Sequence, residues 1–311
     1  MSLDPKLKEL LDQPADPNAK PIEEIPIEEI RRQFNEEIAA IDKPGPEMKD
    51  IQDRAVDVGD AEIQVRWYIP STLSAESGNP VLVFFHGGGW IQGNIATHDS
   101  MCRVLAHDGR SLVCSVDYRL APENKFPVPL NDSYAATKWV YQNAAKFGGD
   151  PGRLAVGGDS AGGNLAAAIS LKARDEGSTP IAFQLLLYPV TDLASDTESK
   201  RKFSKGYWLD TLAFLIQSYV AKEEDKTNPL ASPLRAENFS GLPPAYIVTA
   251  GHDPLRDEGR AYATRLQEAG VEARYDCSES MIHGFISIRG IVGEGERALQ
   301  ACAASLREAF D

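Results

Sequence analysis

A single serine, Ser160, stands between two pairs of glycines in the segment VGGDSAGGNL at positions 156–165. A serine hydroxyl becomes an effective nucleophile only when a base within hydrogen-bond reach removes its proton. Two downstream residues can complete such an arrangement: Asp253 follows the apolar segment AYIVTAGH, and His283 follows VEARYDCSE with three residues between. These residue types indicate attack on a carbonyl carbon, with the imidazole as base and the carboxylate holding it in the right tautomer.

The surroundings of Ser160 decide between two serine motifs that belong to unrelated folds. The segment is close to the GDSGG of trypsin-like proteases, and it also fits G-x-S-x-G, the nucleophile elbow, from Gly158 to Gly162. An elbow requires a strand, a very tight turn and then a helix. Residues 154–156 predict the strand, and the alanine-rich run after Gly163 predicts the helix. Because the candidate partners also lie downstream in an α/β pattern, we interpret the segment as an elbow.

Five histidines compete for the role of base. His252 is the main rival of His283 because it adjoins Asp253. Neighbouring residues at a strand end point to opposite sides, so Asp253 could hardly orient His252. His283 follows a strand in a loop and completes the chain order serine, acid, histidine, so we expect it to be the base. The other three are expected to have structural or ordinary roles: His86, His98 and His107.

The acid has alternatives as well. Asp253 directly follows a predicted strand and precedes a helix-like start, a position that would also suit a plain helix N-cap. Asp257 and Glu258 fall within the same turn and are alternatives on spacing alone. The strand-end position favours Asp253. Asp159 adjoins the nucleophile, but its side chain should point away from the tip of the elbow, and we interpret it as structural.

A second glycine-rich motif, HGGGW at positions 86–90, directly follows the apolar run VLVFF. Backbone N–H groups aimed at a carbonyl oxygen that gains negative charge can lower the barrier to acyl transfer by about 3–4 kcal/mol. HGGG is a known oxyanion-loop pattern, and the amide after the nucleophile is another donor. We therefore expect an oxyanion hole formed by Gly88, Gly89 and Ala161, with Gly87 as a further candidate. Nearby aromatic residues either line a pocket or pack in the core: Trp90, Tyr207, Trp208 and Phe214.

Strands that alternate with helices are expected to position these residues. VLVFF (81–85), SLVCSVDY (111–118) and IAFQLLLYP (181–189) are continuous apolar runs, typical of strands covered on both faces. AEIQVRWYIP (61–70) alternates like a half-buried antiparallel strand. Helical spacing between the runs, as in NDSYAATKWVYQNAAKFG (131–148), predicts an α/β fold with a mostly parallel central sheet flanked by helices.

Two stretches depart from this alternation and are expected to form a helical cap. The second half of 21–41 suits an amphipathic helix that must pack on another part of the chain. The region from Thr191 to about Pro244 has the character of a helical insertion with aromatic residues. The expected units are an N-terminal cap segment (1–50), the first part of the core (51–192), a cap insertion (193–240) and the second part of the core (241–311).

With these motifs in place, the sequence resembles the bacterial hormone-sensitive-lipase-like carboxylesterases. The matching segments are HGGGW (86–90), DYRLAPE (117–123), GDSAGGNLA (158–166), DPLRDEG (253–259) and HGF (283–285), in the order of that family. The resemblance implies an α/β-hydrolase fold with a helical cap and hydrolysis of short to medium acyl-chain esters without a cofactor.

Other functions with the same fold stay open at this point. A lipase is less expected because the acidic chain shows no obvious interfacial anchor, whereas an amidase would use the same triad. The plant gibberellin receptors resemble this family yet lack a working histidine, so a binding protein is a further alternative. The presence of Ser160, Asp253 and His283 weighs against a pure receptor. A homodimer is expected only by analogy.

Composition narrows the classes of partner and location. The 311 residues carry a formal net charge of −14, which repels nucleic-acid phosphates and anionic lipid, so both are poor candidate partners. The partner that the resemblance implies is a small-molecule ester. No apolar run approaches the ~20 residues that span a bilayer, and the N-terminus lacks a secretory-signal pattern, which favours a cytoplasmic location. The four cysteines are scattered without a C-x-x-C pair, which argues against a zinc site and against a disulfide framework. We expect no metal site, and the resemblance implies no cofactor.

Overall fold

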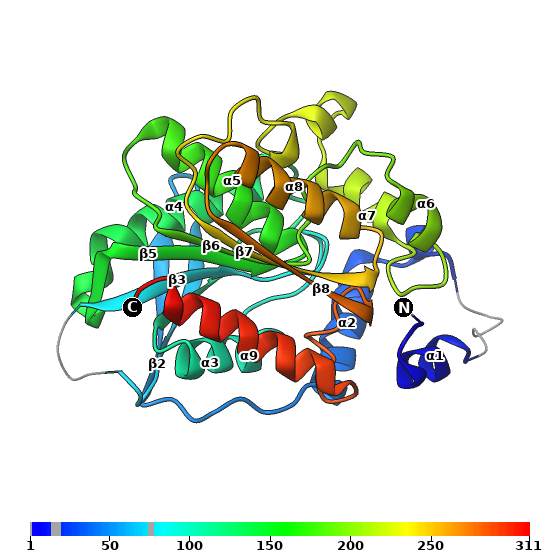
Figure 1. Cartoon of the computed structure of the whole chain (residues 1–311), viewed down its shortest axis with the longest axis horizontal. Helices are drawn as coiled ribbons and strands as arrows, with labels where there is room; N and C mark the ends of the chain where they lie inside the picture. The colour runs from blue at the N-terminus through cyan, green and yellow to red at the C-terminus, as the bar shows by residue number, and fades with distance from the viewer. Residues whose placement is uncertain (1, 14–19, 74–77) are drawn as a thin grey trace.

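A twisted sheet runs through the centre of the computed structural model, which describes residues 2–13, 20–73 and 78–311 (Figure 1). Within these residues, the strand order of the eight-stranded sheet is β1-β2-β4-β3-β5-β6-β7-β8. β2 pairs antiparallel with β1 and β4, and all later neighbours are parallel. The mostly parallel sheet is therefore confirmed. The strands are β1 (Asp50–Asp57), β2 (Glu62–Ile69), β3 (Asn79–Phe85), β4 (Leu112–Asp117), β5 (Gly149–Asp159), β6 (Phe183–Leu187), β7 (Ala245–His252) and β8 (Ala273–Ile282).

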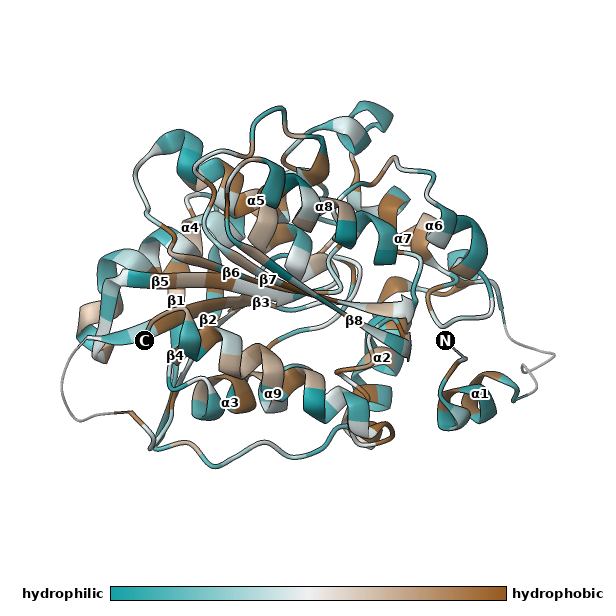
Figure 2. Cartoon of the chain, in the orientation of Figure 1, coloured by the Kyte–Doolittle hydropathy of each residue, from teal (hydrophilic) through white to brown (hydrophobic). Residues whose placement is uncertain are grey.

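Helices cover both faces of the sheet, and β3 shows how its apolar run serves two cores. Val81, Val83 and Phe85 belong to the hydrophobic cluster under α4, α5 and α8, whereas Leu82 and Phe84 belong to the cluster under α3 and α9. Successive side chains of a strand point to opposite faces, so a strand between two helix layers must be apolar throughout. Figure 2 shows the same division, with apolar strands inside and polar helix faces outside. The covering helices are α3 (Asp99–Asp108), α4 (Val128–Asn143), α5 (Ala161–Glu176), α8 (Arg256–Glu268) and α9 (Gly293–Glu308).

β1 was not predicted from the sequence. Its residues, DIQDRAVD, are mostly polar, and Val56 is the only side chain of the strand that is buried. The strand lies at the edge of the sheet and pairs with β2 over its full length, from Asp50 opposite Ile69 to Asp57 opposite Glu62. An edge strand with one partner needs few apolar side chains, because backbone hydrogen bonds to β2 hold it in place.

The remaining helices gather beyond the carboxyl ends of the parallel strands, at the right of Figure 1. Arg31 holds α2 in this place. Its guanidinium donates hydrogen bonds to the carbonyl oxygens of Ile91 (2.8 Å) and Ala121 (3.0 Å). It also forms an ion pair with Glu123 at 2.7 Å. The predicted amphipathic helix in the second half of 21–41 is thus confirmed as α2. These elements are α1 (Pro5–Leu11), η1 (Ile22–Glu24), α2 (Ile27–Ile41), α6 (Glu198–Phe203) and α7 (Leu212–Tyr219), and further short turns are η2 (Ala144–Phe147), η3 (Glu223–Thr227) and η4 (Pro233–Arg235).

Candidate active site

Ser160 lies on a sharp turn between β5, which ends at Asp159, and α5, which begins at Ala161. Its φ of 54° and ψ of −114° lie in a region that L-residues rarely adopt, at a cost of about 1–3 kcal/mol. Glycines make the turn sterically feasible, because a Cβ on Gly158 or Gly162 would overlap the carbonyl oxygen of Phe85. The strand, tight turn and helix expected around Ser160 are all present.

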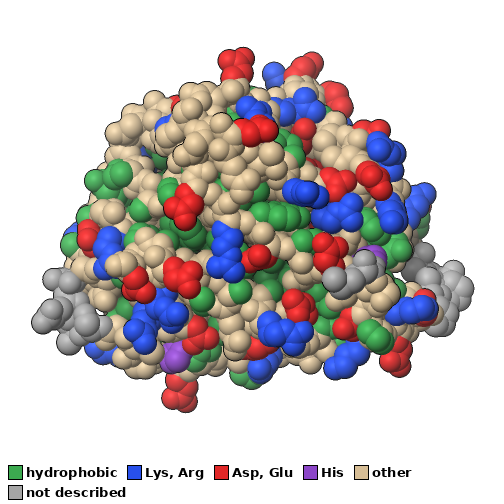
Figure 3. Space-filling model, viewed as in Figure 1, with side chains coloured by type: hydrophobic (Ala, Val, Ile, Leu, Met, Phe, Trp, Pro, Cys, Tyr) green, Lys and Arg blue, Asp and Glu red, His purple; other side chains and the backbone are tan. Residues whose placement is uncertain are grey.

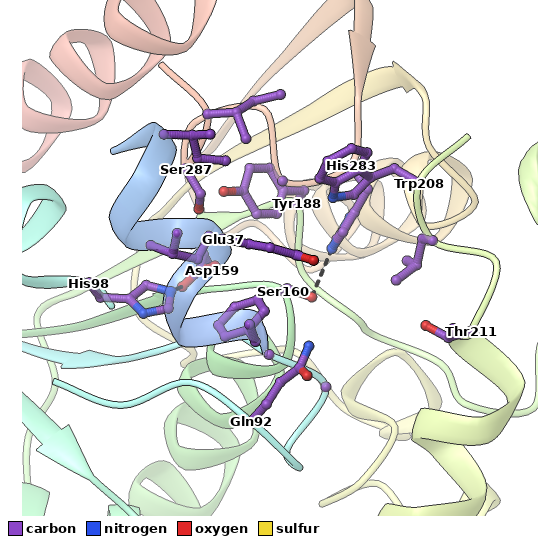
Figure 4. Close-up of a pocket in the computed structure, with 18 of the residues that line it drawn as sticks. Glu37, Gln92, His98, Asp159, Ser160, Tyr188, Trp208, Thr211, His283 and Ser287 are labelled. Carbon is purple, nitrogen blue, oxygen red and sulfur yellow. Dashed lines mark hydrogen bonds and ion pairs between the residues drawn. The ribbon is translucent and has the colours of Figure 1, made fainter. Parts of the chain in front are cut away.

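The expected acid and base meet Ser160 from the loops after β7 and β8. Asp253 directly follows β7, and His283 directly follows β8. His283 Nε2 lies 2.9 Å from Ser160 Oγ (Figure 4). His283 Nδ1 lies 2.8 Å from Asp253 Oδ2. The side chain of Asp253 is fully buried, and that of His283 is nearly so. This geometry lets the serine hydroxyl donate to one imidazole nitrogen while the other donates to the carboxylate.

Asp253 is held at both of its carboxylate oxygens, although it is not the N-cap of α8, which is Leu255. While Oδ2 faces His283, Oδ1 accepts a hydrogen bond of 2.8 Å from the backbone N–H of Leu255, just before α8. The helix start therefore anchors the carboxylate, and the carboxylate remains free to orient the imidazole. A side chain held at both oxygens keeps a single rotamer, which preserves the position of His283.

The alternative acids have other partners. Asp257 accepts a 2.8 Å hydrogen bond from the backbone N–H of Ser199. Glu258 is fully buried, pairs with Lys200 at 2.6 Å and accepts from the backbone of Thr191 at 2.7 Å. Burial raises the pKa of Glu258 in spite of the Lys200 charge. Both acids thus tie α8 to the 191–200 segment, away from His283.

The rival base, His252, lies among aromatic rings instead of beside an acid. Its ring stacks on Tyr207 with centroids 5.8 Å apart and meets Phe203 edge-on at 5.3 Å. Burial lowers the pKa of His252. As expected, Asp253 does not orient His252, because its carboxylate binds His283 instead.

The glycine loop after β3 leaves backbone donors free near the nucleophile. Gly88 has a φ of 110° and Gly89 a φ of 60°, and both line the same cavity as Ser160. Their N–H groups, like that of Ala161 at the first position of α5, have no hydrogen-bond partner within the described chain. The N–H of Gly87 instead donates to Asp159 Oδ1 at 2.8 Å. Gly87 is thereby engaged, which leaves the other three as the available donors.

Sequence reasoning missed a second buried histidine–aspartate pair beneath this loop. His98 Nε2 lies 3.1 Å from Asp159 Oδ1, and His98 Nδ1 lies 2.9 Å from the hydroxyl of Thr97. Burial raises the pKa of Asp159, but the charge and hydrogen bond of His98 and the Gly87 N–H outweigh it, so the pKa lies below its usual value. Asp159 points away from the elbow tip, as expected, yet it joins the elbow to the oxyanion loop. Nothing in the spacing of His98 pointed to this contact.

His86 supports the loop from the other side. Its ring is fully buried and stacks on Tyr118 with centroids 4.3 Å apart. Its Nδ1 donates to the carbonyl oxygen of Gly87 at 2.8 Å, and Tyr118 donates to the carbonyl of His86 at 2.7 Å. Burial lowers the pKa of His86 to about 3, so the ring is neutral at physiological pH. These contacts agree with the interpretation that His86 stabilises the geometry of the loop.

A cavity of about 460 Å³ opens in front of Ser160, and its walls are mostly apolar. Of the aromatic candidates, Trp208 lines this cavity, whereas Trp90 is fully buried and stacks on Tyr219 at 4.1 Å. The apolar walls come from both segments of the predicted cap, 1–50 and 193–240, and from the loop after β8. These residues are Leu10, Phe34, Ile38, Ala40, Ile41, Leu209, Leu215, Ile288 and Ile291.

Among residues 2–13, 20–73 and 78–311, no group of three or more histidine, cysteine, aspartate or glutamate side chains could hold a metal ion. In the same part of the chain, no helix is both long enough and apolar enough to cross a membrane.

Comparisons with known proteins identify the family of this chain. Residues 82–287 match the family model described as alpha/beta hydrolase fold. Esterase LipI of Mycobacterium tuberculosis is 42% identical over 84% of this chain and 82% of its own length. An arylesterase of Saccharolobus solfataricus is 38% identical over 92% of this chain and 93% of its own.

Solved structures extend the likeness to the whole chain. The ester-hydrolase EH1AB1 from the metagenome of Lake Arreo, solved with a derivative of bipyridine phosphonate, is 40% identical. It superposes with a TM-score of 0.94 over 99% of both chains. The chain therefore belongs to the alpha/beta hydrolase fold family, among its hormone-sensitive-lipase-like carboxylesterases, and is a carboxylic ester hydrolase.

Proposed function

We propose that Ser160, His283 and Asp253 hydrolyse short to medium acyl-chain esters through an acyl-enzyme. The observation that carries this proposal is the chain of contacts from Ser160 Oγ to His283 Nε2 (2.9 Å) and from His283 Nδ1 to Asp253 Oδ2 (2.8 Å), at the floor of an apolar cavity. The arrangement is that of a serine nucleophile with a base oriented by an acid.

The steps follow from the positions of these atoms. Ser160 Oγ attacks the ester carbonyl carbon while its proton passes to His283, and Asp253 stabilises the resulting imidazolium. The carbonyl oxygen, now negative, accepts hydrogen bonds from the N–H groups of Gly88, Gly89 and Ala161. When the intermediate collapses, the alcohol leaves with the proton of His283. A water molecule then gives a proton to His283 and attacks the acyl carbon. As the carbon–Oγ bond breaks, His283 returns this proton to Ser160 Oγ, and the carboxylic acid leaves.

The substrate range is part of the proposal. A series of p-nitrophenyl esters from acetate to palmitate should give the highest kcat/KM at about four to eight acyl carbons, because an apolar cavity of about 460 Å³ has room for short chains. A maximum at the longest chains would indicate a lipase.

Matched ester and amide substrates should differ strongly in rate, in favour of the ester. Comparable rates on both would indicate an amidase, and no turnover of any ester would indicate a binding protein.

The wider organisation belongs to the same proposal. Segments 1–50 and 193–240 act as the cap, an assignment supported by the cavity-lining residues Ile38 and Leu215, one from each segment; residues 14–19 of the first segment lie outside the described ranges. We expect no nucleic-acid partner, because Figure 3 shows lysine and arginine interspersed with acids over the face drawn, and the net charge is −14. A cytoplasmic location and a homodimer stay predictions, for cell fractionation and light scattering to test.

A further inference from the structure

One carboxylate interrupts the apolar face that α2 turns toward the catalytic cavity. Phe34, Ile38 and Ile41 line the cavity at helical spacing, and Glu37 lines it between them. Glu37 is also exposed to solvent, so it lies at the mouth of the cavity. Figure 4 shows its side chain extending from α2 toward the Ser160–His283 pair.

Glu37 has no structural task comparable to those of its neighbours. Glu29 and Glu36, on the same helix, each pair with Arg32 at 2.6 and 2.7 Å. Within the described chain, Glu37 has neither an ion pair nor a hydrogen bond. Its negative charge is therefore available to a ligand.

The rest of the cavity does not balance this charge. No lysine or arginine is among the described residues that line it. The two histidines and the second acid that line it are already engaged, since His98 pairs with Asp159 and His283 with Asp253. An aromatic ring is also present: Trp208 lines the same cavity and is 47% exposed. A carboxylate and an exposed indole are the groups that attract an ammonium ion, by charge and by cation–π interaction.

We propose that Glu37 makes the mouth of this cavity select esters that carry a positively charged ammonium group and disfavour esters that carry a carboxylate. This inference rests on the proposed function, because it takes Ser160 as the nucleophile on the floor of the same cavity. The ammonium group lies outside the reacting ester, at the mouth, where Glu37 and Trp208 face it. Since the site is open to water, the selectivity weakens as salt screens the charges.

Two esters of the same shape test the proposal: 2-(trimethylammonio)ethyl butanoate and its uncharged analogue 3,3-dimethylbutyl butanoate. The measured quantity is the ratio of kcat/KM for the charged ester to that for the neutral one. In Glu37→Gln this ratio should fall roughly twofold to fivefold, the effect of losing a solvated charge pair. The kcat/KM of the neutral ester should stay within about twofold. Rising salt should lower the ratio in the unmodified protein and leave it nearly constant in Glu37→Gln.

Glu36→Gln is the matched control. It removes the same charge at the neighbouring position, and the side chain of Glu36 does not line the cavity. It should leave the ratio unchanged. An equal ratio in the unmodified protein and in Glu37→Gln would overturn the proposal, and so would an equal fall in both variants. Failure of the proposed function has a different signature: neither ester would be hydrolysed, or hydrolysis of both would survive Ser160→Ala.

Discussion

Two buried histidine–aspartate pairs flank the same elbow, and they differ in what their imidazole nitrogens face. His283 lies 2.8 Å from Asp253, and its second nitrogen meets Ser160 Oγ at 2.9 Å, facing the cavity. His98 lies 3.1 Å from Asp159, and its second nitrogen meets the hydroxyl of Thr97. The two pairs have the same chemical groups at similar distances, but only the His283 pair contacts the reacting oxygen.

The difference separates proton transfer from positioning. A base needs a nitrogen within reach of the proton that it removes, and both nitrogens of His98 are engaged elsewhere. Asp159, by contrast, accepts from the N–H of Gly87 and adjoins Ser160 in sequence, so it holds the oxyanion loop at a fixed place relative to the nucleophile. We therefore assign His283 and Asp253 to catalysis and treat Asp159 and His98 as positioning residues.

The largest expected effect is at His283. His283→Ala should lower kcat for a butanoate ester roughly 10⁵- to 10⁶-fold, because no other histidine of the described residues contacts Ser160 Oγ. His98→Gln, measured beside it, should lose at most about tenfold. Circular dichroism of both variants checks that the fold is intact. An equally severe loss in a folded His98→Gln would remove the distinction between the two pairs.

A smaller effect is expected at Asp159. Asp159→Asn keeps the shape of the side chain but removes the charge that binds His98 and Gly87, so the oxyanion loop shifts relative to Ser160. Since loss of a whole oxyanion donor costs about 10²- to 10³-fold in kcat, we expect a fall of about tenfold. KM for the ester should stay nearly constant, because the loop's donors act most strongly in the transition state. A rise in KM with kcat unchanged would contradict the positioning role.

The smallest effect concerns stability and its dependence on pH. His98 and Gly87 hold the pKa of Asp159 below its ordinary value of 3.8. A carboxylate whose pKa is lower in the folded chain stabilises the fold above its ordinary pKa, and this contribution is lost as pH falls through the lowered value. Asp159→Asn should thus lower Tm by roughly 2–4 °C at pH 7. The gap between the two Tm values should narrow in acid, and a gap that widened there would contradict the assignment.

The sequence was sufficient for the parts of the site that follow from strand ends. Asp253 and His283 each come directly after a strand, and the carboxyl ends of parallel strands meet at one edge of the sheet, so their convergence with Ser160 was predictable. The apolar runs predicted the strands that helices cover on both faces. By contrast, β1 (Asp50–Asp57) is mostly polar and was missed, because an edge strand that pairs only with β2 needs few apolar side chains.

The contacts that could not be predicted depend on how loops and helices dock. His98 reaches Asp159 only because the glycine loop folds back under the elbow, and no periodicity encodes that path. The position of Glu37 could not be predicted for the same reason. The α2 helix carries several acidic residues, and only its docking shows which acidic side chain faces the cavity. Asp253 illustrates a third case. The sequence also allowed it to be a plain helix N-cap, but α8 has Leu255 as its N-cap, and Asp253 binds the Leu255 N–H with one oxygen and His283 with the other.

The central claim is that Ser160 is the activated nucleophile, and labelling with a p-nitrophenyl phosphonate ester tests it most directly. The reagent should release about one equivalent of p-nitrophenol, abolish hydrolysis of a butanoate ester and leave a phosphonyl group that peptide mapping places on Ser160. Ser160→Ala should stay unlabelled, and His283→Ala should react far more slowly because its serine lacks a base. A stoichiometric adduct on any other residue, or equal labelling of Ser160→Ala, would contradict the account.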